Sequence, residues 1–241
     1  MKNILLLLLL SLNIYSQTIE SYFEIPKNYK RIIQNDYHSW IISKNINTKD
    51  HVKYFSGQIK KGFNKVYVAK FVYDIGNKDL HQCADAVMYN KARYLFESKQ
   101  YNKISFTFSH NAKIYSYSGS FQNFNEYTFK KYITKVWAWS GTWSLDTYDT
   151  VNINIKDIKP GDLFIVGGFP GHAISVIDVV INKNGHKKYM LAQSYMPAQE
   201  QQILLNPIKK HSVWYDLHET KDIVTPQYVF TVKQLKRFKN N

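Results

Sequence analysis

The chain of 241 residues contains a single cysteine, Cys83, which excludes an internal disulfide and a cysteine-rich zinc cluster. No apolar run reaches the ~20 residues that a helix needs to cross a bilayer. The sequence has neither a proline-rich linker nor an internal repeat. The motifs G-x-S-x-G, H-E-x-x-H and G-x-x-x-x-G-K-S/T are also missing. We therefore expect a folded domain with one unpaired thiol, and we predict no metal ion or other cofactor.

Acidic residues are scarce: 32 lysines and arginines face 18 aspartates and glutamates, which gives a net charge of +14. The positive charge is spread along the chain, with no block of five or six basic residues. This distribution favours attraction to anionic cell-envelope polymers, or to a peptide substrate, over nucleic acid, for which no recognised motif is present. The sequence does not indicate an oligomeric state.

The first 16 residues have the pattern of a secretory signal peptide. Lys2 provides the positive start, residues 4–12 are apolar except for Ser11, and Ser16 precedes the expected cleavage point. The alternative is a hydrophobic core helix at the extreme terminus. We predict export to the periplasm or the extracellular space. Residues 17–241 are then expected to form one α+β domain with an N-terminal elaboration.

Cys83 is expected in the first turn of a helix that follows a strand and a loop. Residues 66–73 alternate as a strand, and Asp79 with Gln82 three residues later is a predicted capping box. Apolar residues then recur with helical spacing as far as about Glu97. The partial positive charge of a helix start would stabilise a thiolate, as in a catalytic nucleophile. The alternative is a buried structural thiol that faces the core.

His172 is the best candidate for a base among the eight histidines. Residues 163–180 are expected to form two strands joined by a glycine-rich turn, and His172 opens the second of these strands. Asn184-Gly185 predicts a hairpin that leads to a third strand over residues 189–195. The glycines before His172 would let a substrate approach its ring closely.

A third polar side chain should orient the imidazole ring, and strand parity selects it. A hairpin at residues 183–185 places His172 on the same sheet face as Gln193, Tyr195 and Pro197, and not as Ser194. Gln193 is the only amide on that face, so we predict that it accepts a hydrogen bond from His172. Two to four residues separate Gln193 from the position opposite His172, which requires a bulge or strong twist. Tyr195 is the alternative.

The order of these residues resembles the papain-like cysteine hydrolases, and most closely the NlpC-type bacterial cell-wall peptidases and amidases. Several segments resemble an uncharacterised family of exported bacterial proteins: QCADAV at 82–87, GGFPGHA at 167–173, LAQSYMPAQE at 191–200, Trp214-Tyr215 and LKRF at 235–238. The resemblance implies a papain-like α+β arrangement, with a nucleophile-bearing helix packed on an antiparallel sheet. It also implies that Cys83, His172 and Gln193 are the catalytic residues. Gln82 departs from the acidic residue that cell-wall peptidases commonly place before the cysteine.

The sequence leads to two functional hypotheses. The first is an exported cysteine hydrolase that cleaves amide bonds in the cell envelope, either in peptidoglycan peptides or in acyl-amides. The second is a non-catalytic envelope- or glycan-binding protein on the same fold. Three tryptophans bear on the second hypothesis, because they would either pack in the core or form a platform for sugar rings: Trp137, Trp139 and Trp143.

Two further expectations concern other parts of the chain. A metal site formed by His81, Cys83 and His172 is a weaker alternative for the role of the cysteine. Residues 227–232 are expected to form the final strand, and the basic tail after them is expected to be a solvated end.

Overall fold

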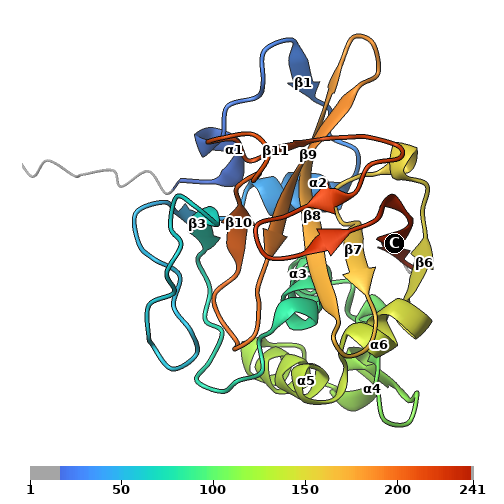
Figure 1. Ribbon diagram of the computed structural model, residues 1–241. Coiled ribbons are helices and arrows are strands. Elements are labelled where there is room, and N and C mark those ends of the chain that lie inside the picture. The colour runs from blue at the N-terminus through green and yellow to red at the C-terminus, as the bar shows by residue number, and fades with distance from the viewer. Residues whose placement is uncertain (1–16, 240–241) are drawn as a thin grey trace, which may run out of the picture.

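The computed structural model describes residues 17–239, and its centre is a ten-stranded antiparallel sheet (Figure 1). Across the sheet the strands are β2 (Ile46–Asn47), β3 (Tyr67–Phe71), β10 (Gln202–Leu204), β9 (Lys187–Gln193), β8 (His172–Asn182), β7 (Leu163–Val166), β14 (Leu235–Phe238) and β6 (Thr150–Asn152). β1 (Tyr29–Arg31) pairs with β8, and β11 (Trp214–Asp216) pairs with β9. Two small hairpins lie outside this sheet: β4 (Ser105–Thr107) with β5 (Ile114–Ser116), and β12 (Ile223–Val224) with β13 (Val229–Phe230).

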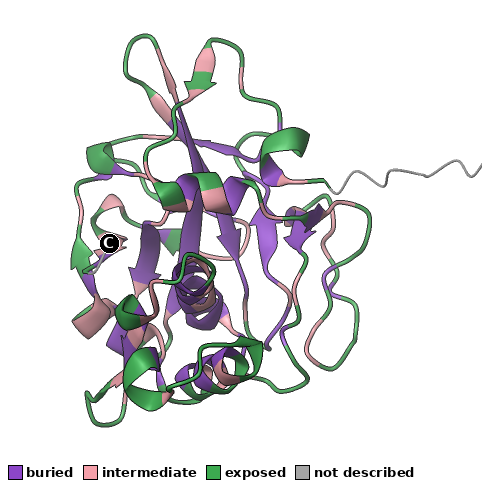
Figure 2. Cartoon of the chain, turned by 180° about the vertical axis from the view of Figure 1, so that it is seen from behind, coloured by how far each residue is buried: buried purple, intermediate pink, exposed green. Residues whose placement is uncertain are grey.

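Of the longest helices, α3 (Cys83–Glu97) packs against the sheet, and α5 (Glu126–Trp139) packs on α3 (Figure 1). The remaining helical segments are short: α1 (Ile19–Tyr22), α2 (Asp36–Ile42), α4 (Tyr117–Ser120), α6 (Thr142–Ser144), η1 (Tyr101–Lys103), η2 (Leu145–Asp149), η3 (Ile155–Asp157) and η4 (Val232–Gln234). Figure 2 shows that burial is concentrated in the central strands and in the helix behind them, while the outer loops are exposed. The molecule is therefore α+β with a large antiparallel sheet, as predicted at this level.

The helix that carries Cys83 begins later than the capping pattern predicted. Gln82 is the N-cap of α3, and its backbone N–H donates to Asp85 Oδ2 at 3.0 Å. Asp79 does not cap the helix, because its Oδ1 accepts the Ala198 backbone N–H at 2.6 Å instead. The predicted cap was therefore wrong by three residues. As a result Cys83 is the first residue of the helix, where backbone N–H groups have no partner within the helix.

Successive residues of β8 face opposite layers of the protein. Ala173 packs in the cluster formed with α3 and α5, whereas Ile174 and Val176 pack toward the β12–β13 hairpin. A bulge between Val176 and Asp178 then shifts the register with β9 by one residue. The residues of this strand thus contribute to three hydrophobic clusters, the third of which contains Ile177 and Val180.

The basic tail is part of the sheet, so the prediction of a solvated end was wrong. β14 lies between β7 and β6, and Leu235 is fully buried. Arg237, in the same strand, donates to both carboxylate oxygens of buried Asp162, at 2.6 and 2.9 Å. The predicted final strand at 227–232 is present only as β13, and it is not the last strand.

Two sequence predictions concern the membrane and export. Among residues 17–239, no helix is long and apolar enough to cross a membrane. The predicted signal peptide at residues 1–16 lies outside the described residues.

Candidate functional site

Cys83 lies at the start of α3 with only 6% of its surface exposed. Its sulfur is reached by backbone N–H groups of Ala173 in β8, of Ala84 and of Cys83 itself, each of which favours the thiolate. Burial outweighs these contacts and raises the pKa of the Cys83 thiol to about 11, with a smaller contribution from Asp85. Burial therefore favours the protonated thiol at neutral pH over the thiolate that a helix start by itself would stabilise.

Asp85, two residues further along α3, has a carboxyl group whose ionisation is disfavoured. Burial raises the pKa of its carboxyl well above the usual range, although the N–H of Gln82 opposes this effect. Its Oδ1 atom is buried and forms no hydrogen bond with the described residues.

His172 is 2% exposed, and its Nε2 forms a 2.9 Å hydrogen bond with Gln193 Oε1. Its ring packs against Tyr195, Tyr228 and Phe230, with centroids 4.7, 5.0 and 5.9 Å away. Burial lowers the pKa of His172 to about 4; Gln193 raises it and the positive charge of Lys60 lowers it further. The imidazole is therefore neutral at pH 7, like the thiol.

The hydrogen bond predicted between His172 and Gln193 is present, and the sheet register explains how it forms. Ser175 pairs with Ala192, and continuing this register places His172 opposite Tyr195. Gln193 is then the diagonal neighbour of His172 on the same face, a separation that long side chains bridge. The bulge in β8 produces this register. Nearer the hairpin turn the pairing of β8 with β9 is offset by one residue from the pairing beyond the bulge.

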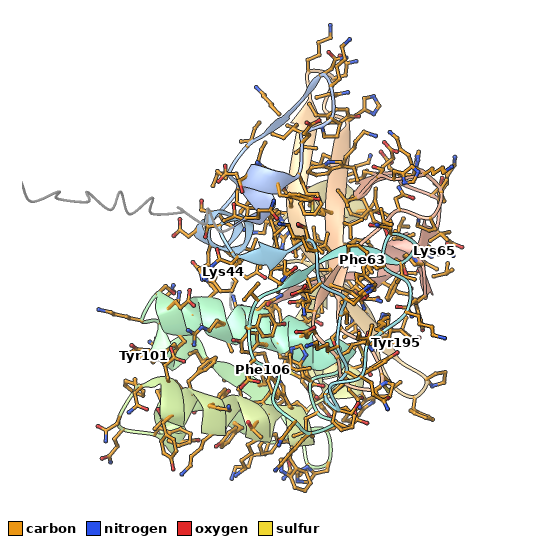
Figure 3. All side chains as sticks on the ribbon, turned by 90° about the vertical axis from the view of Figure 1, so that its left-hand side faces the viewer. Lys44, Phe63, Lys65, Tyr101, Phe106 and Tyr195 are labelled. Carbon is orange, nitrogen blue, oxygen red and sulfur yellow. The ribbon has the colours of Figure 1, made fainter. Side chains whose placement is uncertain are left out.

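Two contacts place Cys83 close to His172. The backbone N–H of Ala173, the residue directly after His172, lies near enough to the Cys83 sulfur to lower the pKa of the thiol. Tyr195, whose ring contacts His172, also interacts electrostatically with Cys83. In Figure 3, Tyr101 lies near the C-terminal end of α3 and Tyr195 lies near the opposite end, where the helix begins. The three predicted residues therefore gather at one end of α3.

A cavity of about 230 Å³ gives access to Cys83. Its walls include the start of α3, Trp137, Met196 and the glycine-rich turn before His172. His172 does not line this cavity. Phe169, at the tip of the turn, is 95% exposed and stands at the cavity's edge. A second cavity, of about 470 Å³, shares Leu80 and Trp137 with the first and has a largely apolar floor.

The glycine-rich turn is held in one shape by its neighbours. Gly167 donates its N–H to Asp146 Oδ2 at 3.1 Å, and Gly168 O accepts the hydroxyl of Thr142 at 3.1 Å. A Cβ on Gly171 would lie 2.4 Å from Gly168 O and 2.5 Å from the Thr142 hydroxyl oxygen. Only glycine fits here, so this turn keeps the entrance to the cysteine open at a fixed width.

Sequence reasoning missed two residues behind the imidazole. Lys60 is 4% exposed, and its Nζ donates to Gln199 Oε1 at 2.6 Å and to Gln227 Oε1 at 2.9 Å. Gln227 Oε1 also accepts Gln193 Nε2 at 2.8 Å. Lys60 lies beside another lysine in a polar stretch of sequence, which is typical of surface charge. Its burial comes only from distant segments, so no local signal could have identified it.

The weaker metal hypothesis is wrong. Both ring nitrogens of His81 are engaged within the protein, Nδ1 with Gln199 O at 3.1 Å and Nε2 with the Tyr73 hydroxyl at 3.2 Å. Across residues 17–239, no three His, Cys, Asp or Glu side chains gather in a group that could hold a metal ion.

The three tryptophans divide between the two roles considered for them. Trp137 packs edge-on against His81, with ring centroids 5.0 Å apart. Trp139 and Trp143 are 50% and 43% exposed. Trp137 is therefore a packed residue that also forms a cavity wall, and the other two are available on the surface.

Comparison with known proteins places the chain in a family. The model of the family described as a domain of unknown function (4846) matches residues 19–237, and the chain therefore belongs to that family. No curated protein and no solved structure matched the chain. The match spans both cavities and all three residues predicted to form the site.

Proposed function

We propose that this chain is a cysteine hydrolase that cleaves amide bonds, with a papain-like arrangement of Cys83, His172 and Gln193. The observation that carries the proposal is the 2.9 Å bond between His172 Nε2 and Gln193 Oε1, at the strand end whose next N–H meets the Cys83 sulfur. This is a nucleophile beside a base, and the base is oriented by a third group. Such a group of side chains is characteristic of covalent amide hydrolysis.

The chemistry follows from the neutral state of both groups. As the Cys83 sulfur attacks the carbonyl carbon, its proton passes to Nδ1 of His172, and a C–S bond replaces the C=O π bond. The oxyanion that forms accepts hydrogen bonds from N–H groups at the start of α3. Collapse of this intermediate breaks the C–N bond, and the amine leaves with the proton from His172. Water then cleaves the thioester by the same steps, and the thiol and the imidazole are restored.

The two adjoining cavities support an acyl-amide or a peptide with an apolar group as the substrate. The scissile carbonyl is placed at Cys83, and the apolar group extends past Leu80 and Trp137 into the larger cavity. Arg93 and Lys130 at that cavity's rim are paired with Glu126 and Asp74, so the attraction for an anionic polymer comes from the net charge of the whole chain, +14. Together with the export signal predicted at residues 1–16, this favours material of the cell envelope as the source of substrate.

A non-catalytic envelope- or glycan-binding protein is the second candidate. The exposed faces of Trp139 and Trp143 favour it, because indole rings stack on sugar rings. The buried, protonated state of the thiol also suits a residue that does no chemistry.

Hydrolysis assays with muropeptides and an acyl-amide series separate these candidates. We expect turnover by the wild-type protein, and loss of turnover in Cys83→Ala and in His172→Ala. His186→Ala, an exposed histidine in the β8–β9 turn, is the matched control and should retain activity. Turnover that persists in Cys83→Ala would show that the nucleophile is misassigned. Binding without turnover by any variant would support the second candidate.

The same series tests the substrate class. Thr134 is half-buried on α5 in the wall of the larger cavity. Thr134→Phe should lower kcat/KM for substrates with large apolar acyl groups, because it fills the space they occupy, and it should leave acetyl-amides unaffected. An equal effect on both kinds of substrate would place the acyl group elsewhere.

A further inference from the structure

Lys60 is a buried lysine that amide oxygens hold in place. Its Nζ donates to Gln199 Oε1 and Gln227 Oε1, and no carboxylate of residues 17–239 forms an ion pair with it. A buried ammonium is costly to desolvate, so an uncompensated lysine here needs an explanation. Burial lowers the pKa of Lys60 to about 7. Its place in the fold is directly behind the amide that contacts the imidazole.

The contacts form a chain from Lys60 to the imidazole ring. Lys60 Nζ donates to Gln227 Oε1, which also accepts Gln193 Nε2 at 2.8 Å. Gln193 Oε1 then faces His172 Nε2 at 2.9 Å. Two glutamines link the ammonium to the ring, and the link uses one donor and one acceptor from the amide of Gln193.

The directions of these bonds follow from the donor at the end of the chain. Below its pKa of about 7 Lys60 is an ammonium, which has donors only, so Gln227 must turn its oxygen toward it. Gln193 must then offer its NH₂ group to that oxygen, and therefore its own oxygen to the ring. An oxygen can only accept, so the proton of the neutral imidazole is on Nε2. Either glutamine could be turned around in isolation; the lysine removes that freedom.

We propose that Lys60 is a positioning residue that fixes the tautomer of His172 through Gln227 and Gln193. A proton on Nε2 leaves the lone pair on Nδ1, which is the nitrogen able to take the proton of a thiol. A proton on Nδ1 would make the ring unable to act as a base at that atom. The catalytic consequence rests on the proposed function, whereas the tautomer itself does not depend on any activity.

The test is nitrogen NMR on the full chain, labelled with ¹⁵N-histidine and with the His172 signals assigned by comparison with His172→Gln. In the wild type we expect Nε2 to carry the proton and Nδ1 to be unprotonated. Lys60→Met removes the donor, and the single-tautomer pattern of His172 should be lost. Lys60→Arg retains a side chain that can only donate, and should restore the wild-type pattern.

A second variant guards against misfolding of Lys60→Met. Gln227 is half-buried, and Gln227→Leu breaks the same chain without touching the lysine. It should likewise produce a mixture of tautomers, with kcat lowered about two- to tenfold and KM unchanged, in proportion to the population in the wrong tautomer. Folded Lys60→Met or Gln227→Leu proteins with the wild-type pattern would overturn the proposal, as would a wild-type proton on Nδ1. If amide hydrolysis is absent while the tautomer behaves as expected, only the proposed function fails.

Discussion

Slow alkylation of Cys83 is the most direct consequence of its burial, and the lone cysteine makes it measurable without interference from other thiols. Burial moves the pKa of this thiol from 9.0 to about 11. At pH 7.4 a shift of that size lowers the thiolate fraction about 100-fold. A more basic thiolate is intrinsically more nucleophilic, which restores a factor of about 6 to 10. We therefore expect iodoacetamide to react at least tenfold more slowly with the native chain than with the unfolded chain, and more slowly still because the sulfur is 94% buried.

The assay follows mass addition over time at pH 6 to 11, with the native chain and the chain in guanidinium side by side. The native rate should rise tenfold per pH unit up to about pH 11, while the unfolded rate levels off near pH 9. A native rate that is fast and independent of pH between 6 and 9 would refute the reasoning. That profile would mean that the resting state is a thiolate–imidazolium pair.

The same shift has a consequence for stability, because the folded pKa lies above the unfolded one. The protonated thiol then stabilises the folded state fully below pH 9, and this contribution disappears as pH rises from 9 to 11. Its size is about 3 kcal/mol. The free energy of unfolding of Cys83→Ala should therefore fall less between pH 8 and pH 10.5 than that of the wild type, which denaturant unfolding at these two pH values would measure. Equal declines in both proteins would contradict the raised pKa.

Three further predictions concern the turn, the tail and the buried lysine. Gly171→Ala should abolish hydrolysis and lower Tm, because the added Cβ has no room beside Gly168 O. As a control, the Cys83 thiol of this variant should still react with iodoacetamide in the unfolded chain. Arg237→Ala should destabilise the fold by about 3–5 kcal/mol, since it leaves the buried carboxylate of Asp162 unpaired, and Asp162→Asn in the same background should recover part of that loss in denaturant titrations. In the wild type, kcat/KM should rise as pH passes about 7, because Lys60 loses its charge there and the imidazole becomes a stronger base. Lys60→Arg never loses its charge, so a pH profile that still rises at 7 in that variant would assign the step to another group.

Local patterns in the sequence predicted the elements that carry the site. Apolar spacing at helical period identified the helix after Cys83, and alternation identified the strand that begins at His172. The parity argument then selected Gln193. In any hairpin register in which paired residue numbers add up to an odd number, Gln193 lies on the same sheet face as His172. That prediction succeeded through a bulge that the sequence does not reveal.

Other features could not be predicted, because they depend on contacts between distant segments. Residues 235–238 have no strong strand pattern, and they form a strand only because β7 and β6 offer an open position between them. Lys60 is buried by glutamines 139 and 167 positions away along the chain. The direction of the pKa shift of Cys83 could not be predicted for the same reason. A helix start is visible in sequence, whereas the depth of burial that outweighs it is a property of the packed structure.

Burial also disfavours charge on the thiol, the imidazole and Asp85 before a substrate arrives. The thiol, the imidazole and Asp85 each lose more by carrying charge in this low-dielectric interior than local hydrogen bonds return. Proton transfer from Cys83 to His172 would create two charges there, one of them facing the positive charge of Lys60. The transfer becomes favourable only when a carbonyl is in place, because the negative charge then moves to an oxygen held by helix-start N–H groups rather than remaining on the buried sulfur. A resting thiol with a raised pKa is therefore compatible with catalysis. In this mechanism the thiol is not ionised beforehand, so substrates are selected at the step in which the proton is transferred within the bound complex.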